Sequence, residues 1–177
     1  MNSLQFNLTE DVMKQPRETS AGYLFNHLAR LFAQALQERI QPLGLSIGVF
    51  PIMLHLWEEE GLTQKQLVQR VGIEQGTMAN TLKRMERDGL VVSQRDLSDG
   101  RRREIRLTEH GRSLRSPALR IAAEQNTYML SGLTKEEQAE ILTLVTKIIR
   151  SVERSAISEK EARADRASSH RADGETR

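Results

Sequence analysis

The sequence predicts a mainly α-helical fold with a small β-hairpin. Three observations support this fold class. Apolar residues recur at three- and four-residue steps through the first and last thirds of the 177-residue chain. Two short segments near its middle are separated by a glycine, which is typical of paired short helices. The apolar period then changes to two around an Asp-Gly pair, which indicates a tight turn between strands.

The first helix follows a polar arm, residues 1–18, that has no apolar period. Thr19 or Ser20 can cap the start of this helix, and Pro42 with Gly44 ends it. Its apolar positions are Leu24, Leu28, Leu31, Phe32, Ala35, Leu36 and Ile40. We therefore expect an amphipathic helix with one broad apolar face.

A second helix and a short third helix come next. Pro51 lies inside the second apolar run, so this helix either kinks there or begins near Phe50. Thr63 and Gln66 form a Thr-x-x-Gln capping box at the start of the third helix, and Gly72 ends it.

A fourth helix and a hairpin complete the central region. The helix covers about residues 75–88, and Gly89 takes the position of a left-handed cap. Its buried stripe is expected at Met78, Leu82 and Met85. The hairpin runs out along residues 91–92 and back along residues 105–107, with Asp99-Gly100 at the turn. Two short helices with a glycine turn between them, followed by a hairpin, make a winged helix-turn-helix.

The carboxy-terminal third predicts further helices and a polar tail. Thr108 caps a long helix that Pro117 interrupts, and Thr134 with Glu137 forms a second capping box. The final helix carries Ile141, Leu144, Val145, Ile148 and Val152. After Ile157 the chain has five charges of each sign and almost nothing apolar, so we expect disorder or fraying helix there.

These elements divide the chain into five expected parts. They are a flexible arm (1–18), a dimerisation helix (19–45), a winged helix-turn-helix lobe (46–112), carboxy-terminal dimerisation helices (113–157) and a disordered polar tail (158–177). The fold class is thus mainly α with a small β-hairpin wing, a winged helix-turn-helix plus a helical dimerisation region. Because the first and last helices carry more apolar surface than a compact lobe can cover, we expect an obligate homodimer.

Composition limits the classes of protein that this chain can represent. It has no cysteine, which excludes disulfides and thiolate metal sites and fits a reducing cytosol. It shows no signal peptide and no apolar stretch near the length of about 18 residues that spans a membrane. We therefore expect a cytoplasmic protein with no membrane partner. The net charge is only +2, but residues 63–112 hold 11 Lys and Arg against 7 Asp and Glu.

The polar positions of the fourth helix match the chemistry of DNA recognition. Gln and Asn can bond both N6 and N7 of adenine, and Thr can touch a thymine methyl or a phosphate. Lys and Arg farther along would meet backbone phosphates, and a glycine in the first turn lets N–H groups approach one closely. The candidates are Gln75, Gly76, Thr77, Asn80, Lys83 and Arg84. The alternative is an ordinary surface helix with solvated polar residues.

Arginines on the hairpin make the DNA-binding interpretation more specific. An exposed arginine at a hairpin tip fits the narrow, electronegative minor groove beside a helix in the major groove. The candidates are Arg95, Arg101, Arg102 and Arg103, whereas Arg106 has the alternative of a solvated charge. The ordered helix and hairpin predict double-stranded DNA as the partner. A two-fold dimer would read a near-palindromic operator.

The segment LTQKQLVQRVGIEQGTMANTLKRMERDGLVVSQRDLSDGRRREIRLTEHG resembles the multiple-antibiotic-resistance regulator (MarR) family. The most specific elements are the Gly-Leu-Val ending at Val91, the Asp-Gly-Arg beginning at Asp99, and the Arg-Leu-Thr-x-x-Gly beginning at Arg106. The resemblance extends from about Ala21 to Arg154. It implies a triangular homodimer with intertwined first and last helices. It also implies that Arg101 enters the minor groove and that Asp99 positions it.

The sequence departs from the family pattern at three points. Glu74 replaces the short Ser, Asp or Asn that usually precedes the DNA-reading helix, which weakens the expected cap. The absence of cysteine rules out the peroxide-sensing branch. Pro117 interrupts what is normally one continuous helix.

The histidines leave the question of an effector open. None of the four lies at metal-ligand or catalytic spacing, so we expect neither an enzyme nor a cofactor. By resemblance, the chain would be a repressor released by an aromatic or anionic small molecule, with His27, Arg30 and His55 as candidate contacts. A lone histidine in an apolar helix is more often a core residue. The alternatives are a metal-responsive regulator using His27, His55 and Glu58 or Glu59, and a winged-helix module that binds protein or RNA.

Overall fold

The computed structural model describes residue 17, residues 19–95 and residues 102–174, with side chains as far as residue 155. The chain divides into two compact units, Met1–Met129 and Leu130–Arg177. Apart from Arg17, the expected amino-terminal arm lies outside the described residues.

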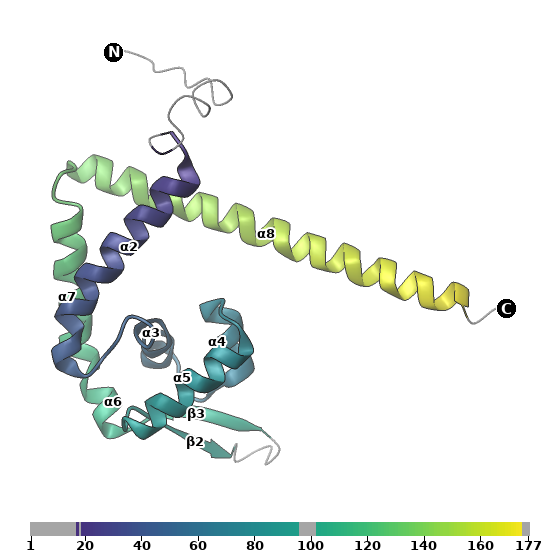
Figure 1. Cartoon of the computed structure of the whole chain (residues 1–177), viewed down its shortest axis with the longest axis horizontal. Coiled ribbons are helices and arrows are strands. Elements are labelled where there is room, and N and C mark those ends of the chain that lie inside the picture. The colour runs from purple at the N-terminus through teal and green to yellow at the C-terminus, as the bar shows by residue number, and fades with distance from the viewer. Residues whose placement is uncertain (1–16, 18, 96–101, 175–177) are drawn as a thin grey trace. The chain divides into compact units, whose positions relative to one another are not determined.

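The first unit opens with helix α2 (Ala21–Ile40), shown in Figure 1. Ser20 caps this helix, because its hydroxyl accepts a hydrogen bond from the backbone N–H of Tyr23 at 3.3 Å. A 3₁₀ turn, η1 (Gln41–Leu43), ends it, and Gly44 leaves the turn with a φ of +74°. The capping and the end of the helix therefore follow the sequence prediction.

Helix α3 (Phe50–Glu58) begins at Phe50, so the start near this residue is confirmed and the kink is not needed. Pro51 lies in the first turn, where a helix leaves its backbone N–H groups without internal partners. Five of the nine residues of α3 are buried, which makes it the central helix of the lobe that follows.

Helices α4 (Gln64–Val71) and α5 (Gln75–Arg87) form the helix-turn-helix. The predicted capping box at α4 is confirmed. The Thr63 N–H donates to Gln66 Oε1 at 2.8 Å, and the Gln66 N–H donates to Thr63 Oγ1 at 3.3 Å. Gly72 ends α4 with a φ of +72°, a left-handed conformation that favours glycine.

Strands β2 (Val91–Arg95) and β3 (Arg103–Leu107) form the predicted hairpin, with Val91 paired to Leu107 and Arg95 to Arg103. A short strand, β1 (Leu62–Thr63), pairs with the other edge of β3 and gives the order β1-β3-β2. This third strand was not predicted, because two residues cannot show an alternating pattern.

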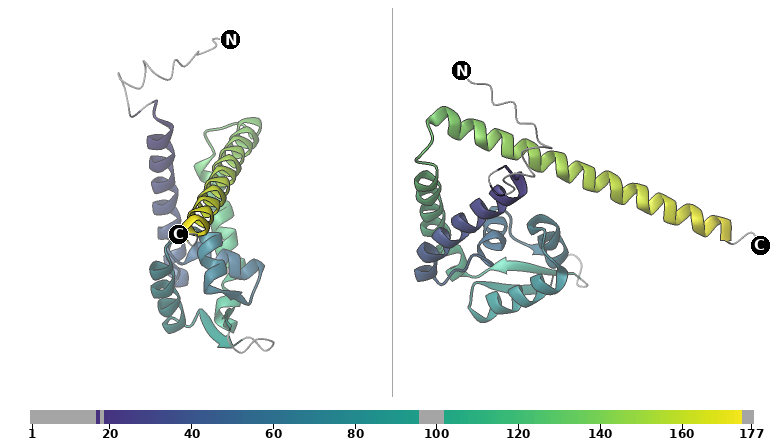
Figure 2. Two further views of the ribbon diagram at one scale, coloured as in Figure 1. Left: turned by 90° about the vertical axis from the view of Figure 1, so that its right-hand side faces the viewer. Right: turned by 45° about the horizontal axis from the view of Figure 1, so that its top comes forward.

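Helices α6 (Glu109–Ser113) and α7 (Arg115–Met129) correct the expectation of a helix interrupted at Pro117. The break falls at Leu114, and Pro117 is the third residue of α7, where its missing N–H costs little. Helix α7 then lies along α2 (Figure 2), and an ion pair between Arg39 and Glu124 joins the two helices.

The second unit consists mainly of helix α8 (Lys135–Gly174). Its predicted capping box is confirmed, since the Thr134 N–H donates to Glu137 Oε2 at 2.8 Å and the Glu137 N–H to Thr134 Oγ1 at 3.3 Å. Helix α8 continues to Gly174, through most of the segment (158–177) for which the sequence predicts disorder or fraying helix. Four alanines between residues 158 and 174 favour helix despite the polar composition.

The core of the first unit joins α3, α4, α5 and the three strands. Its largest fully buried side chains are Ile40, Ile52, Met53, Leu56, Leu62, Leu67, Met78, Met85 and Val91. The predicted fold class, a mainly helical chain with a small winged helix-turn-helix sheet, is confirmed. Among the described residues, no helix is both long and apolar enough to cross a membrane.

Candidate nucleic-acid interface

Helix α5 has one buried face and one exposed face. Met78 and Met85 are fully buried and Leu82 is 5% exposed, so the predicted stripe is confirmed. Thr81 is buried beside them, because it lies three residues after Met78 and four before Met85, although its side chain is polar. The predicted DNA-reading residues are all exposed: Gln75, Gly76, Thr77, Asn80, Lys83 and Arg84. The exposed face therefore presents amides, a hydroxyl and cations together.

The first turn of α5 is open. Glu74 occupies the capping position without a side-chain capping bond among the described residues, as its length predicts. No heavy atom lies within 4 Å of where a Cβ would sit on Gly76. The Nε2 of Gln64 donates to the Gln75 carbonyl at 3.4 Å, which ties α4 to this turn. The amino-terminal N–H groups of α5 can therefore be approached closely by an anion.

The hairpin places two of its predicted arginines opposite each other at the outer end of the paired strands. Arg95 and Arg103 are directly opposed in the register, and both are exposed. Arg103 Nε donates to Ser93 Oγ at 2.9 Å, which directs its guanidinium along the β2 side of the ribbon. Arg102 is exposed next to it. Asp99 and Arg101, the predicted tip residues, lie outside the described residues.

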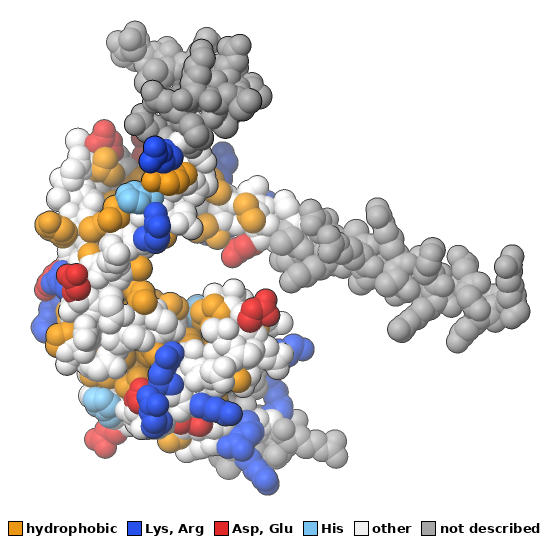
Figure 3. Space-filling model, in the orientation of Figure 1, with side chains coloured by type: hydrophobic (Ala, Val, Ile, Leu, Met, Phe, Trp, Pro, Cys, Tyr) orange, Lys and Arg blue, Asp and Glu red, His pale blue; other side chains and the backbone are white. Residues whose placement is uncertain are grey.

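The lysines and arginines of these elements gather on the helix-turn-helix lobe. Figure 3 shows blue side chains over α5 and the hairpin strands, at the bottom of the view. The exposed basic residues of these elements are Lys83, Arg84, Arg87, Arg95, Arg102, Arg103 and Arg106. Arg87 forms an ion pair with Asp88 at 2.9 Å. A surface with this excess of cations attracts the phosphate backbone of nucleic acid.

Arg106 differs from the outer arginines of the hairpin. Its Nη2 donates to Glu104 Oε2 at 2.8 Å, within the same strand. Arg106 therefore has a carboxylate partner near the base of the hairpin. This supports the alternative that Arg106 is a solvated charge and not a DNA contact.

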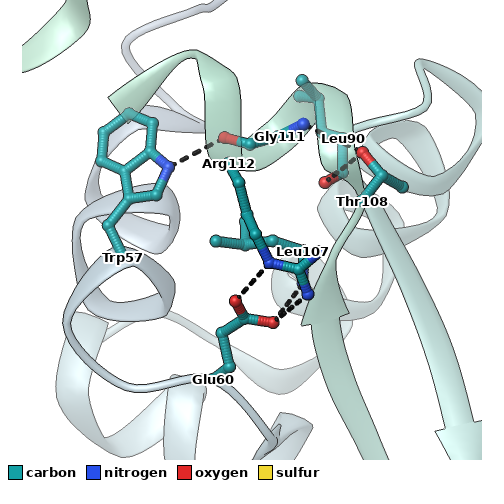
Figure 4. Close-up of polar contacts among 7 residues, drawn as sticks. All are labelled: Trp57, Glu60, Leu90, Leu107, Thr108, Gly111 and Arg112. Atoms are coloured by element: carbon teal, nitrogen blue, oxygen red, sulfur yellow. Dashed lines mark hydrogen bonds and ion pairs between the residues drawn. The ribbon is translucent and has the colours of Figure 1, made fainter. Parts of the chain in front are cut away.

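The base of the hairpin is held by a polar junction that sequence reasoning missed (Figure 4). Glu60, in the connection after α3, accepts two hydrogen bonds from Arg112, each at 2.7 Å. It also accepts one from the Leu107 N–H, at the end of β3, at 3.3 Å. The bonds from Arg112, more than the remaining contacts, hold the pKa of the Glu60 carboxyl below its ordinary value. One carboxylate thus joins three elements.

A second set of bonds closes the same junction on the other side (Figure 4). Thr108 caps α6 by accepting from the Gly111 N–H at 2.9 Å, while its hydroxyl donates to the carbonyl of Leu90 at 3.2 Å. The Trp57 Nε1–H donates to the Gly111 carbonyl at 2.9 Å. A Cβ on Gly111 would lie 2.2 Å from the Leu90 carbonyl oxygen, so only glycine fits. The Thr-x-x-Gly spacing was the available signal for this contact.

The candidate effector residues form only a partial cluster. On α2, His27 stacks on Tyr23 with ring centroids 5.9 Å apart, and Arg30 Nη2 lies 3.3 Å from His27 Nδ1. Both His27 and Arg30 are exposed. His55 lies on α3 and is half-buried. The structure therefore joins His27 to Arg30 on one helix.

The metal-responsive alternative finds no support in the geometry. Within residues 19–95 and 102–155, no group of three or more His, Asp or Glu side chains could hold a metal ion. His27, His55, Glu58 and Glu59 do not form such a group. Glu59 instead pairs with Arg70.

Comparisons with known proteins identify related sequences over the same lobe. The MarR family model matches residues 45–102. The HTH-type transcriptional regulator TtmR of Methylorubrum extorquens (strain PA1) is 37% identical over 87 residues, which cover 49% of this chain. The match spans only 45% of the length of that relative.

Solved structures share the fold over a longer part of the chain. A MarR transcriptional regulator from Methanosarcina mazei Go1 is 28% identical with a TM-score of 0.68, covering 73% of this chain and 94% of that one. The transcriptional repressor CouR, bound to a 23-mer DNA duplex, is 22% identical with a TM-score of 0.70, covering 77% and 96%. At that identity, the second comparison concerns the fold alone. The proteins compared are all transcriptional regulators by name.

Proposed function

We propose that this chain is a transcriptional regulator of the MarR family and that it binds double-stranded DNA with α5 in the major groove and the hairpin over the adjacent minor groove. The activity is regulation of transcription in the cytoplasm, without catalysis. A protein with the same fold, CouR, is bound to a DNA duplex, which supports DNA as the partner.

The observation that carries the proposal is the exposed face of α5. Gln75 and Asn80 expose amides that can pair with adenine edges, and Lys83 exposes a cation farther along the helix. Their backbone is fixed from behind by the buried stripe, so the face is presented on a rigid element. A module that binds protein would not need this sequence of amides followed by cations.

The hairpin supplies the second contact of the proposal. Arg95, Arg102 and Arg103 would lie along the phosphates and the minor groove, where a narrow groove attracts arginine. Arg101 and Asp99 keep the roles that the family resemblance implies, at the tip and as its positioning residue.

We infer that the active form is a homodimer. Helix α2 exposes five large apolar side chains: Tyr23, Leu24, Phe25, Leu28 and Leu31. Helix α8 exposes another five: Leu142, Leu144, Ile148, Ile149 and Val152. Surfaces of this kind are rare on monomers, and a second copy of the chain would bury them. A two-fold dimer then requires a near-palindromic operator, with half-sites about 10 base pairs apart or a multiple of that.

The test is selection of bound duplexes from a random pool, followed by anisotropy titrations on the selected and a scrambled duplex. Asn80→Ala should weaken binding to the selected duplex by about 1–3 kcal/mol and leave the scrambled duplex nearly unchanged. Gln34→Ala, on the exposed side of α2, is the matched control. Equal losses of affinity for both duplexes would show that α5 does not read base edges.

A second role, release of DNA by an aromatic or anionic effector, is favoured by one observation. The His27 ring, stacked on Tyr23, and the adjacent Arg30 guanidinium offer an aromatic face and a cation on one exposed surface. A bound effector would also have to reach His55 on α3 for this third candidate residue to contribute. Such an effector acts only if it binds the free and DNA-bound conformations differently. Titration of salicylate against the preformed DNA complex, with His27→Ala and Arg30→Ala as variants, tests this role.

A further inference from the structure

We propose that Arg95 and Arg103 hold one phosphate of the DNA backbone between them, and that Ser93 is the positioning residue that fixes Arg103 for this contact. The two arginines lie at the outer end of the paired strands, where they are directly opposed in the register. The inference deepens the proposed DNA binding and rests on it. It assigns one shared contact to two side chains that would otherwise be separate exposed charges.

Strand alternation places both arginines on the side of the hairpin that faces the helices. Successive side chains of a strand point to opposite faces, so Arg95 shares a face with Val91 on β2, and Arg103 shares a face with Ile105 on β3. Val91 and Ile105 are 1% and 5% exposed, and they belong to the core that contains the buried face of α5. The arginine pair therefore continues, beyond the core, the same face that packs against α5.

The two guanidinium groups carry like charges at short range. Directly opposed side chains in an antiparallel pair have Cβ atoms about 4.5–5.5 Å apart, and like charges there are destabilising. Among the described residues, neither Arg95 nor Arg103 forms an ion pair with a carboxylate. Glu104, which pairs with Arg106, lies on the opposite face of β3. A phosphate between the two guanidinium groups would offset their repulsion, and its oxygens accept hydrogen bonds from both.

Ser93 restrains one of the two arginines. Arg103 Nε donates to Ser93 Oγ at 2.9 Å, and Arg103 Nη2 donates to the Ser93 carbonyl at 3.4 Å. Of the five N–H donors of a guanidinium, these bonds use two, so three remain for a phosphate. The bonds orient the guanidinium before binding, so less side-chain entropy is lost when the phosphate binds.

The first experiment measures the phosphate site without DNA. Thermal unfolding of the full-length chain is followed in inorganic phosphate and in sodium chloride of equal ionic strength. At a concentration near its Kd, phosphate should raise the Tm of the wild-type chain by about 1 °C more than chloride does. Arg95→Gln and Arg103→Gln should each lose most of this gain. Arg106→Gln, which changes an exposed arginine on the opposite face, is the matched control and should retain it.

The comparison between variants separates the site from the general effect of phosphate as a salt. Phosphate is excluded from protein surfaces and stabilises all of these chains alike, so only the difference between chains reports the arginine pair. An equal gain in the wild-type chain and in all three variants would overturn the site.

The second experiment uses anisotropy titrations on the selected duplex at several salt concentrations. If the arginines share one phosphate, the double variant Arg95→Gln/Arg103→Gln should reduce the slope of log K against log salt concentration by about 1. Two separate phosphates would reduce it by about 2. The affinity losses of the single variants should not add in the double variant. A reduction of about 2 with additive losses would contradict the shared contact.

The role of Ser93 is tested by removing its hydroxyl and then restoring it. Ser93→Ala should weaken binding to the selected duplex about threefold and leave the salt slope unchanged, because both cations remain. Ser93→Thr should restore the affinity, and threonine suits a strand. In NMR spectra without DNA, the Arg103 Nε–H should exchange with solvent faster in Ser93→Ala than in the wild-type chain or Ser93→Thr. Wild-type affinity in Ser93→Ala, or no rescue by Ser93→Thr, would overturn this role.

The two experiments distinguish failure of this inference from failure of the proposed function. If no duplex is bound, the proposed function is wrong, and a gain in Tm that depends on Arg95 and Arg103 would assign the pair to free phosphate. If DNA is bound and the pair gives no such gain, the shared contact is wrong and the proposed function stands. Circular dichroism establishes that each variant is folded.

Discussion

The two ends of the hairpin use the same residue type in opposite ways. At the base, Arg106 and Arg112 are bonded to the carboxylates of Glu104 and Glu60. Farther out, Arg95, Arg102 and Arg103 are exposed. The basic charge of the lobe is therefore divided between arginines that hold the fold and arginines that are available to a polyanion. Counting basic residues in the sequence cannot separate these two groups.

Contacts on both sides of its base hold the projecting hairpin in place. Exposed ion pairs contribute little stability individually, but Glu60 combines a bidentate arginine with a backbone N–H. On the opposite side, Gly111 approaches the Leu90 carbonyl more closely than any side chain would allow. Close packing and hydrogen-bond geometry therefore determine the structure of the base, whereas exposed positive charge distinguishes the outer end.

The largest effect is expected from adding a side chain at Gly111, at the base of the hairpin. Gly111→Ala would place a Cβ 2.2 Å from a backbone oxygen, so the strands and α6 must separate. We expect a loss of about 3 kcal/mol in the free energy of unfolding, measured by urea denaturation. Gly132→Ala, with no atom within 4 Å of its Cβ, is the matched control and should change little. A Gly111→Ala chain as stable as wild type would show that the base is not closely packed.

The division between paired and available arginines can be tested on DNA. Arg102→Ala should weaken binding and reduce the slope of log K against log salt concentration by about 1, as expected for one lost phosphate contact. Arg106→Ala should leave the slope unchanged, because its partner is Glu104. Anisotropy titrations at several salt concentrations measure both. Identical slopes for the two variants would erase the distinction.

The junction should also show a dependence on pH. The pKa of Glu60 is lowered by its bonds from Arg112, so the charged carboxylate is favoured in the folded state. Its stabilisation is fully present above the ordinary pKa, near 4.5, and is lost as the pH falls through the lowered value. Glu60→Gln should therefore lower Tm modestly at neutral pH, and the difference from wild type should shrink in acid. Glu59→Gln, which breaks the exposed pair with Arg70, should show a smaller difference at every pH.

The smallest effect is expected from removing the far end of α8. This truncation serves as a reference for the variants at the base and at the outer end of the hairpin. A chain truncated after Ile157 loses as many positive as negative charges and almost no apolar residue. Its operator affinity and its free energy of unfolding should both remain within about 0.5 kcal/mol of the full chain, the range of ordinary surface changes. A larger loss in either assay would show that the end of α8 has a partner.

Local chemistry accounts for the parts of the fold that the sequence predicted. The Thr63–Gln66 box, the Gly72 turn and the stripe of α5 depend on residues within a few positions of one another. The exposure of Asn80 and Lys83 follows from the same helical period. The face proposed to read DNA was thus predictable residue by residue.

The remainder depends on contacts between distant positions. Glu60 and Arg112 are 52 residues apart, and no pattern in the sequence around either residue predicts that they form a pair. Strand β1 exists only because β3 offers a free edge, and the break at Leu114 was assigned to Pro117 because proline is the stronger local signal. The burial of the Gln125 amide on α7 likewise results from how α2 and α7 pack, which periodicity does not describe.

The bond from Thr108 to the Leu90 carbonyl, and the close approach of Gly111 to the same carbonyl, have a consequence for how the hairpin can vary. They close the hairpin at its root, at the opposite end of the paired strands from the connection between Arg95 and Arg103. Doubling the length of such a connection costs only about 0.6 kcal/mol in chain entropy. The outer segment can therefore be exchanged, lengthened or shortened as a cassette. Groove preference can then change in a single step while the helix-turn-helix beneath it keeps its fold.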